Sequence, residues 1–207
     1  MALILGSWKP DSSEWHAARA GRIGGSSIAA VCGWSPYETR ADLIARLTGA
    51  LPPKPTSRAM ARGNHLEDGI AGWLAADKGL FYDPDASRAT YGHDRHDWAI
   101  YNPDRITTGG ELVEIKTTHD RTTEAGWGRA GTDRIPLGYA AQVQWGMGIL
   151  NLPMCWVAVL AGATNGRPCL DMAVYRVPAD PDAFAFLLTK AERFMADMAA
   201  HQRRDAA

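Results

Sequence analysis

The feature that most constrains the fold is the alternation of helix-like and strand-like segments, without an internal repeat or a low-complexity tract. Apolar residues recur at helical spacing in some segments, as at Leu43, Ile44 and Leu47. Other segments are short and rich in β-branched residues, which is typical of strands. The expected helices span residues 26–33, 39–49, 57–78 (with a break at Gly63), 137–150 and 180–200, and the expected strands span residues 89–91, 97–101, 112–117, 154–160 and 170–177. This order predicts an α/β or α+β fold in which helices flank a small mixed sheet.

Length and composition limit the class of protein. A chain of 207 residues with 46% hydrophobic and 22% charged residues is typical of a globular protein, and we expect a single domain over residues 1–207. No run approaches the roughly 18 apolar residues of a membrane span. The N-terminus has neither the basic region nor the long apolar region of a signal peptide, so the expected location is the cytoplasm.

The three cysteines, Cys32, Cys155 and Cys169, form no CxxC pair. We expect them to be reduced, with two of them in the core. The spacing argues against a zinc or iron–sulfur site built from cysteine.

The net charge of −1 excludes a uniformly basic nucleic-acid binder, but the charge is unevenly distributed. Residues 1–65 carry eight Lys or Arg against four acids, a net charge of +4 that leaves −5 for the remainder. A basic N-terminal third facing phosphate and an acidic remainder holding a metal is one interpretation. Chance fluctuation is the other.

Asp104, Glu114 and Lys116 form the pattern most indicative of chemistry. Residues two apart in a strand share a face, so Glu114 and Lys116 should point the same way, with Val113 and Ile115 toward the core. Two close carboxylates repel each other and favour a divalent cation, and hard oxygen ligands favour Mg²⁺ or Mn²⁺. Such a metal activates water, which a lysine can orient. The alternative is a chance pattern on a solvated strand face.

The turn at residues 107–110 decides whether the two carboxylates meet. A two-residue loop at Gly109-Gly110 would pair Arg105 with Glu114, whereas a three-residue loop or one bulge would pair Asp104 with Glu114. We predict the second register because it places both carboxylates on one face.

Glu67 lies on one helical stripe with Ile70 and Leu74 and should look inward. A buried carboxylate needs a partner, which a metal ion or its bound water would provide. The alternative is a capping box with Asn64 as N-cap and Glu67 at the third helical position.

Gln142 and Gln144 lie on a mostly apolar helix. Two residues correspond to about 200° on a helix, so both side chains cannot face one site. One of them is expected to reach the reaction centre, and a structural role is favoured for Gln144.

Taken in order, several runs resemble the lambda-exonuclease or YqaJ-type viral recombinase family, the phage alkaline exonucleases of the PD-(D/E)XK nuclease superfamily. The runs are Trp15-His16-x-x-Arg19-x-Gly21-x-Ile23-x-x-Ser26, Arg62-Gly63-x-x-x-Glu67, Pro103-Asp104, Glu114-Ile115-Lys116 and Ala141-Gln142-Val143-Gln144. They cover about residues 15–150, and the ordered set is more specific than any one run. The implied fold is the restriction-endonuclease-like core of that superfamily.

The resemblance implies a phage- or prophage-encoded enzyme in a bacterial host that degrades one strand of linear duplex DNA from its 5′ end to mononucleotides. It implies that Asp104, Glu114 and the main-chain carbonyl of Ile115 bind Mg²⁺, with Mn²⁺ as a substitute. Glu67 completes the acidic cluster, directly or through water. Lys116 matches the catalytic lysine and Gln142 the active-site glutamine.

Arg19 and Ser26 match the family residues that hold the 5′-phosphate. Physical chemistry supports this, because an arginine forms a bidentate fork for phosphate and a helix N-terminus attracts anions. Alternatively, Ser26 simply caps the helix that it is expected to open, and it can do both.

The resemblance also implies a homotrimeric ring around DNA and a single-strand annealing protein as partner. One departure concerns the position after Asp104, where the family often has glycine and this chain has Arg105. A side chain there narrows the site or adds a phosphate contact, and it removes no ligand.

Two other functions remain open. An endonuclease or repair nuclease of the same superfamily would cut closed circular DNA. A catalytically silent DNA-end-binding subunit would bind DNA without metal and without turnover, although the presence of Glu67, Asp104, Glu114 and Lys116 argues against it.

Overall fold

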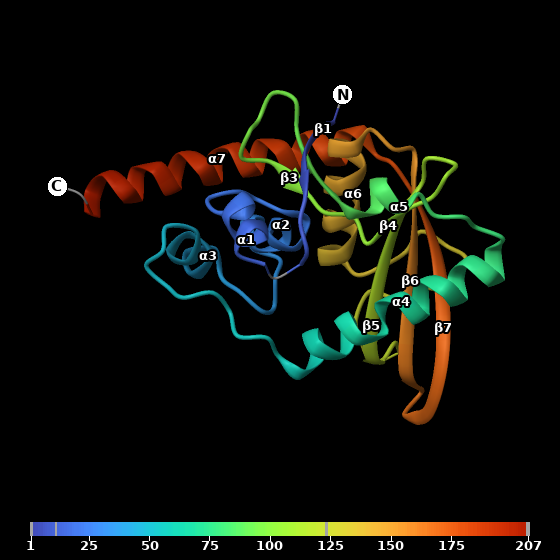
Figure 1. Cartoon of the computed structure of the whole chain (residues 1–207). Coiled ribbons are helices and arrows are strands. Elements are labelled where there is room, and N and C mark those ends of the chain that lie inside the picture. The colour runs from blue at the N-terminus through green and yellow to red at the C-terminus, as the bar shows by residue number, and fades with distance from the viewer. Residues whose placement is uncertain (1, 11, 123, 206–207) are drawn as a thin grey trace.

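The computed structural model describes residues 2–10, 12–122 and 124–205, whose strands form two sheets (Figure 1). The larger sheet has the order β4-β5-β6-β7; β5 and β6 are parallel, and the other neighbours are antiparallel. The smaller sheet, β1-β2-β3, is antiparallel. The strands are β1 (Leu3–Ser7), β2 (Ala89–Gly92), β3 (Ile100–Tyr101), β4 (Arg105–Ile106), β5 (Leu112–Asp120), β6 (Met154–Thr164) and β7 (Arg167–Pro178). The predicted mixed sheet is therefore confirmed.

The helices of the described residues include every one that the sequence predicts. They are α1 (Ser13–Arg19), α2 (Gly25–Val31), α3 (Arg40–Leu47), α4 (Arg58–Lys78), α5 (Pro84–Arg88), α6 (Leu137–Leu150) and α7 (Pro181–Asp205). Asp180 caps the start of α7 by accepting from the backbone N–H groups of Asp182 and Ala183. No helix in the described part of the chain is both long enough and apolar enough to span a bilayer.

Helices cover both faces of the larger sheet (Figure 1). On one face, Leu112 and Val157 share a core with residues of α2, α6 and α7, including the fully buried Trp145. On the other face, Val113 and Ile115 pack against α4. Because side chains alternate along a strand, Glu114 points toward the α6 face. Val113 and Ile115 face the core under α4, as predicted. Glu114 faces the main core, the one formed with α2, α6 and α7, rather than a solvated surface.

The predicted break at Gly63 is wrong, because α4 continues through this residue. Its N-cap is Ser57, whose side chain accepts from the N–H of Met60. The capping box with Asn64 as N-cap is therefore excluded. The alternative interpretation that Ser26 caps its helix is excluded as well, because Gly24 is the N-cap of α2 and Ser26 lies inside the first turn.

The strands around the sheet differ from their predicted lengths. Residues 97 and 98 form a turn, so the predicted strand 97–101 shrinks to β3. By contrast, β6 and β7 continue beyond the predicted 160 and 170 into a hairpin closed by Asn165 and Gly166. Both residues have positive φ, 53° and 72°, which is typical of the Asn-Gly turn that matches the twist of a hairpin.

All three cysteines lie in the described residues and are free thiols. Cys155 is buried, whereas Cys32 and Cys169 are partly exposed. Cys32 packs against the main core, so the expectation of two core cysteines is met.

Candidate active site

Asp104 and Glu114 face each other across β4 and β5. The register pairs Arg105 with Val113 and Ile106 with Leu112, so one further step places Asp104 opposite Glu114. A three-residue loop makes this register, since the N–H of Thr107 donates to the carbonyl of Glu111 at 2.9 Å around residues 108–110. The predicted register is confirmed.

The carboxylate of Glu114 is surrounded by hydrogen-bond donors, and the residue is only 1% exposed. Its Oε2 accepts from the hydroxyl of Tyr101 at 2.7 Å, and its Oε1 accepts from Nε2 of Gln142 at 2.5 Å and from Nζ of Lys116. These donors come from β3, α6 and β5. A buried carboxylate is tolerated only when its lone pairs are satisfied, so the packing of three elements fixes this side chain.

The charges of the cluster shift the proton affinities of its members. Burial and then the negative charge of Glu114 hold the pKa of Asp104 well above its usual range, while Lys116 partly opposes them. Burial alone would lower the pKa of Lys116, but Glu114 and Asp104 outweigh it, and the pKa is raised. Lys116 therefore stays a cation. Asp104 has too little positive charge nearby to offset its burial and the charge of Glu114.

The donor set fits a hard divalent cation. Asp104 accepts the N–H of Ile115 at Oδ2, at 2.6 Å, and lies opposite Glu114, so an added cation would relieve the repulsion between the two carboxylates. Among the described residues, no three His, Cys, Asp or Glu side chains gather into a ready-made cage. A cation held by two carboxylates would take its other ligands from main chain, water or substrate, as Mg²⁺ commonly does.

Glu67 lies near Asp104, but its hydrogen-bond and ion-pair partner is Arg105. Its Oε1 accepts from Nη1 of Arg105 at 2.7 Å, and its side chain is 34% exposed. The negative charge of Glu67 nevertheless contributes to the raised pKa of Asp104, which places the two carboxylates within electrostatic reach.

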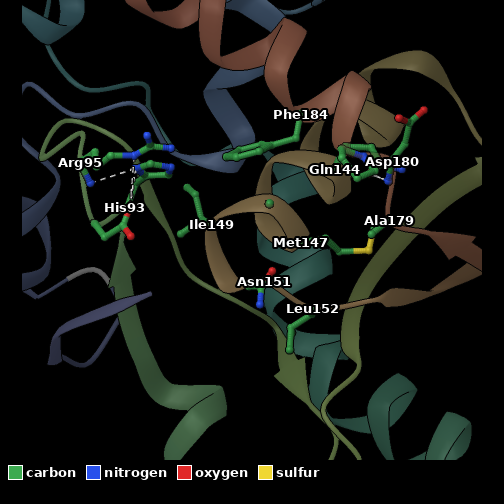
Figure 2. A pocket seen from close by; sticks show the side chains of 13 residues that line it. His93, Arg95, Gln144, Met147, Ile149, Asn151, Leu152, Ala179, Asp180 and Phe184 are labelled. Atoms are coloured by element: carbon green, nitrogen blue, oxygen red, sulfur yellow. Dashed lines mark hydrogen bonds and ion pairs between the residues drawn. The ribbon is translucent and has the colours of Figure 1, made fainter. Parts of the chain in front are cut away.

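Only one glutamine of α6 reaches the centre. Gln142 donates to Glu114, whereas Gln144 donates to the carbonyl of Pro178 at 2.9 Å and accepts the N–H of Asp180 at 2.9 Å. Gln144 and Asp180 line a cavity of about 420 Å³ whose lining includes none of the predicted site residues. Figure 2 shows the two side chains next to each other. The division of roles between the two glutamines agrees with the prediction.

Arg19 is tied to the strand that leads to Asp104. Its Nη1 donates to Oδ1 of Asn102 at 2.5 Å, and its guanidinium lies 4.2 Å from the ring centroid of Trp15. Gly24 lies against it, since a Cβ at that position would be 3.2 Å from Nη2 of Arg19. The guanidinium is thus held beside the first turn of α2.

Ser26 is exposed in that first turn, which packs on the residues holding Glu114. A Cβ on the preceding Gly25 would lie 2.5 Å from the ring of Tyr101 and 3.2 Å from Cγ of Gln142. Only glycine permits this approach. The structure therefore gathers Arg19, Ser26 and the carboxylates in one region.

Sequence reasoning missed three neighbours of the centre. Tyr101 donates to Glu114, Asn102 holds Arg19, and the ring of Tyr139 lies 5.2 Å from Nζ of Lys116. Burial and Glu114 raise the pKa of Tyr101, so it remains a donor. Tyr101 and Asn102 directly precede Pro103-Asp104, and Tyr139 lies three residues before Gln142. This proximity was the available signal, but local patterns do not reveal hydrogen-bond partners.

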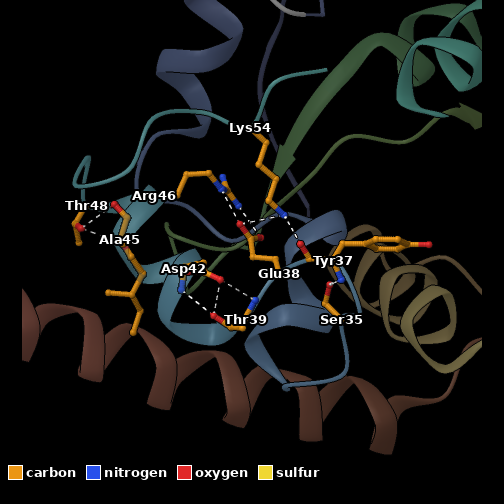
Figure 3. A network of polar contacts seen from close by, with 10 residues as sticks. Ser35, Tyr37, Glu38, Thr39, Asp42, Ala45, Arg46, Thr48 and Lys54 are labelled. Atoms are coloured by element: carbon orange, nitrogen blue, oxygen red, sulfur yellow. Dashed lines mark hydrogen bonds and ion pairs between the residues drawn. The ribbon is translucent and has the colours of Figure 1, made fainter. Parts of the chain in front are cut away.

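Part of the positive charge of the N-terminal third is used internally (Figure 3). The side chain of Glu38 is 6% exposed and pairs with Arg46 at 3.0 Å and Lys54 at 3.2 Å. Burial raises the pKa of Glu38, but these two cations outweigh it and the pKa is lowered. Arg40 pairs with Asp197 at 2.8 Å. Lys54 thus ties the segment that leads into α4 to Glu38, and Arg40 joins α3 to α7. A phosphate-facing role for the remaining cations stays a prediction.

An Asp directly before one strand and a Glu-x-Lys on the neighbouring strand of a mixed sheet between helices are typical of the PD-(D/E)XK nuclease fold. The sequence profile of the YqaJ-like viral recombinase domain matches residues 14–153. The chain therefore belongs to that family, which is a family of nucleases, and the resemblance noted in the sequence is confirmed.

Solved structures share the fold. An alkaline exonuclease from Laribacter hongkongensis, LHK-Exo, is similar with a TM-score of 0.71 and 22% identity over 94% of this chain and 98% of that one. Its complex with dAMP matches with a TM-score of 0.70 and 22% identity over the same shares. A phage-related exonuclease from Haemophilus somnus 129PT matches with a TM-score of 0.60 and 11% identity over 87% of this chain and 96% of that one. The curated proteins contain no match.

Proposed function

We propose that this protein is a Mg²⁺-dependent exonuclease that degrades one strand of linear duplex DNA in the 5′-to-3′ direction and releases mononucleotides. The observation that carries the proposal is the buried Glu114, opposite Asp104 and bonded to Lys116 and Gln142. Family membership and the exonuclease fold support it. The complex of LHK-Exo with dAMP supports a deoxynucleoside monophosphate as a ligand of this protein too.

In this proposal Asp104, Glu114 and the carbonyl of Ile115 hold Mg²⁺, and Mn²⁺ can substitute. The bound ion supplies charge for the scissile phosphate and an activated water. Lys116 remains protonated and orients that water. Gln142 fixes the orientation of the Glu114 carboxylate, and Glu67 completes the acidic cluster.

Arg19 and Ser26 are proposed to hold the 5′-phosphate of the strand being digested. Asn102 orients the guanidinium and Trp15 supports it, so little side-chain freedom is lost when phosphate binds. The exposed hydroxyl of Ser26 lies in the first turn of α2. An anchor at the 5′ end would set the distance from that end to the bond that is cut.

The wider context follows the family. We propose a single nuclease domain over residues 1–207 that acts as a homotrimeric ring in the cytoplasm of a bacterial host, encoded by a phage or prophage. Its partner is a single-strand annealing protein in homologous recombination. A ring retains DNA by enclosing it, so a net charge of −1 is no obstacle.

The test uses three DNAs with Mg²⁺ and with EDTA: a linear 5′-phosphorylated duplex, the same duplex with 5′-hydroxyl ends, and closed circles. The proposal expects rapid Mg²⁺-dependent loss of the 5′-phosphorylated linear duplex with mononucleotide products. Nicking of the circles would instead establish an endonuclease, and metal-independent binding without cleavage would establish an end-binding subunit.

The two glutamines of α6 provide a matched pair of variants. Gln142→Ala removes one donor from Glu114 and should lower the cleavage rate by about 10- to 150-fold, since a hydrogen bond to a charged group contributes about 1.5–3 kcal/mol. Gln144→Ala removes two bonds near Asp180 and should leave the rate unchanged while lowering the thermal midpoint. Initial rates and thermal melts separate these effects, and equal rates for both variants would remove Gln142 from the centre.

A further inference from the structure

Arg105 lies inside the acidic cluster rather than on the surface. It follows Asp104 directly, and its side chain is 19% exposed. Nη1 donates to Oε1 of Glu67 at 2.7 Å and to the carbonyl of Asp104, while Nη2 contacts Asp68. The guanidinium therefore lies between α4, which carries Glu67, and Asp104, the residue that precedes β4.

The two ion pairs of Arg105 differ in strength. Asp68 is 95% exposed, and a pair with an exposed carboxylate contributes little. Glu67 is 34% exposed, so solvent screens it less and the Arg105–Glu67 pair is the more important one. The guanidinium thus mainly neutralises Glu67.

Counting charges around the centre shows which carboxylate lacks a cation. Lys116 pairs with Glu114, and Arg105 pairs with Glu67. Among the described residues, the hydrogen-bond donor to Asp104 is the neutral N–H of Ile115, and no ion pair to Asp104 is present. With all three carboxylates ionised, Glu67, Asp104 and Glu114 together with the two cations have a net charge of −1, and the carboxylate without a cation of its own is Asp104; the exposed Asp68 adds a further negative charge at the edge of the cluster. One divalent cation between Asp104 and Glu114 would reverse that charge, and a second beside Glu67 would meet the guanidinium.

We propose that Arg105 takes the electrostatic place of a second metal ion at Glu67, so that the centre binds a single divalent cation at Asp104 and Glu114. The inference rests on the proposed metal-dependent function and adds a stoichiometry to it. Glu67 then acts as a positioning residue for Arg105. Repulsion between the guanidinium and a second cation, at close range in a partly buried site, provides the physical reason.

Calorimetric titration of the purified chain with Mn²⁺, without DNA, measures this stoichiometry independently of turnover. The wild-type chain should bind about one Mn²⁺ per chain. Arg105→Gln removes the charge but keeps a similar stem, so Glu67 is released and the stoichiometry should rise to about two. Arg105→Lys keeps the charge and should bind about one ion.

The double variant Glu67→Gln with Arg105→Gln tests whether the second ion binds at the Glu67 carboxylate. Its stoichiometry should return to that of the wild type. Arg95→Gln is the matched control, because Arg95 is 80% exposed and lies outside the site. Circular dichroism checks that every variant folds. Two Mn²⁺ on the wild-type chain, or one on Arg105→Gln, would overturn the inference while leaving the exonuclease proposal to the DNA assay. A folded wild-type chain that binds no Mn²⁺ would overturn both.

Discussion

Substitution of Glu114 by glutamine is expected to lower the rate of DNA cleavage by about 10³-fold or more while DNA binding persists. Glutamine keeps the shape of the side chain but removes the charge that would hold the cation. In the proposed function other residues make the phosphate and 5′-end contacts, so affinity for DNA should change little. Single-turnover cleavage of a 5′-phosphorylated duplex measures the first effect, and a binding titration in Ca²⁺ measures the second.

Stability must be measured alongside, because Lys116 loses its ion-pair partner in this variant and a buried unpaired cation is unfavourable. The matched control is Glu192→Gln. Glu192 lies on α7 opposite His96, and its side chain is 50% exposed. This variant should keep full activity. Substantial cleavage by a folded Glu114→Gln protein would remove this residue from the reaction centre.

Arg19→Ala should slow the digestion of 5′-phosphorylated ends by about 10- to 150-fold and affect 5′-hydroxyl ends far less. The magnitude follows from the roughly 1.5–3 kcal/mol of hydrogen bonds to a charged group. The reason is local: the guanidinium is held by Asn102 and supported by Trp15 beside the first turn of α2. Initial rates on two duplexes that differ only in their 5′ ends give the ratio directly.

Arg22→Ala is the appropriate comparison, because it removes the same charge three residues away. Nη1 of Arg22 donates to the carbonyl of Ala18 at 3.1 Å, a bond within its own segment. Its loss should lower both rates equally or not at all. The same proportional loss on both kinds of end for Arg19→Ala would exclude the anchor role.

Local sequence signals predicted the elements that carry the site. The helices at 57–78 and 137–150 and the start of α7 at Asp180-Pro181 agree with the structure, because apolar spacing and capping are encoded within a few neighbouring residues. The errors lie where a local rule competed with packing. Gly63 is a weak helix former, yet α4 runs through it over the sheet. The β6–β7 hairpin is longer than predicted, because its strands continue to a turn at Asn165-Gly166, beyond the predicted strand ends at 160 and 170.

The sequence by itself reduced the pairing of Asp104 and Glu114 to two registers, and the chemistry of two facing carboxylates selected the one that the structure has. Strand alternation and a glycine turn of three residues set that register, and both act over about ten residues. Lys116 shares the face of Glu114 for the same reason.

Only the tertiary structure decided how Glu114 is held and which charges surround it. Tyr101, Gln142 and Arg19 reach the centre from β3, α6 and α1, and the pairing of Arg105 with Glu67 joins β4 to α4. These contacts connect residues 13 to 83 positions apart in the sequence. They exist because helices pack on both faces of one sheet, and packing partners at such separations are not specified by local periodicity.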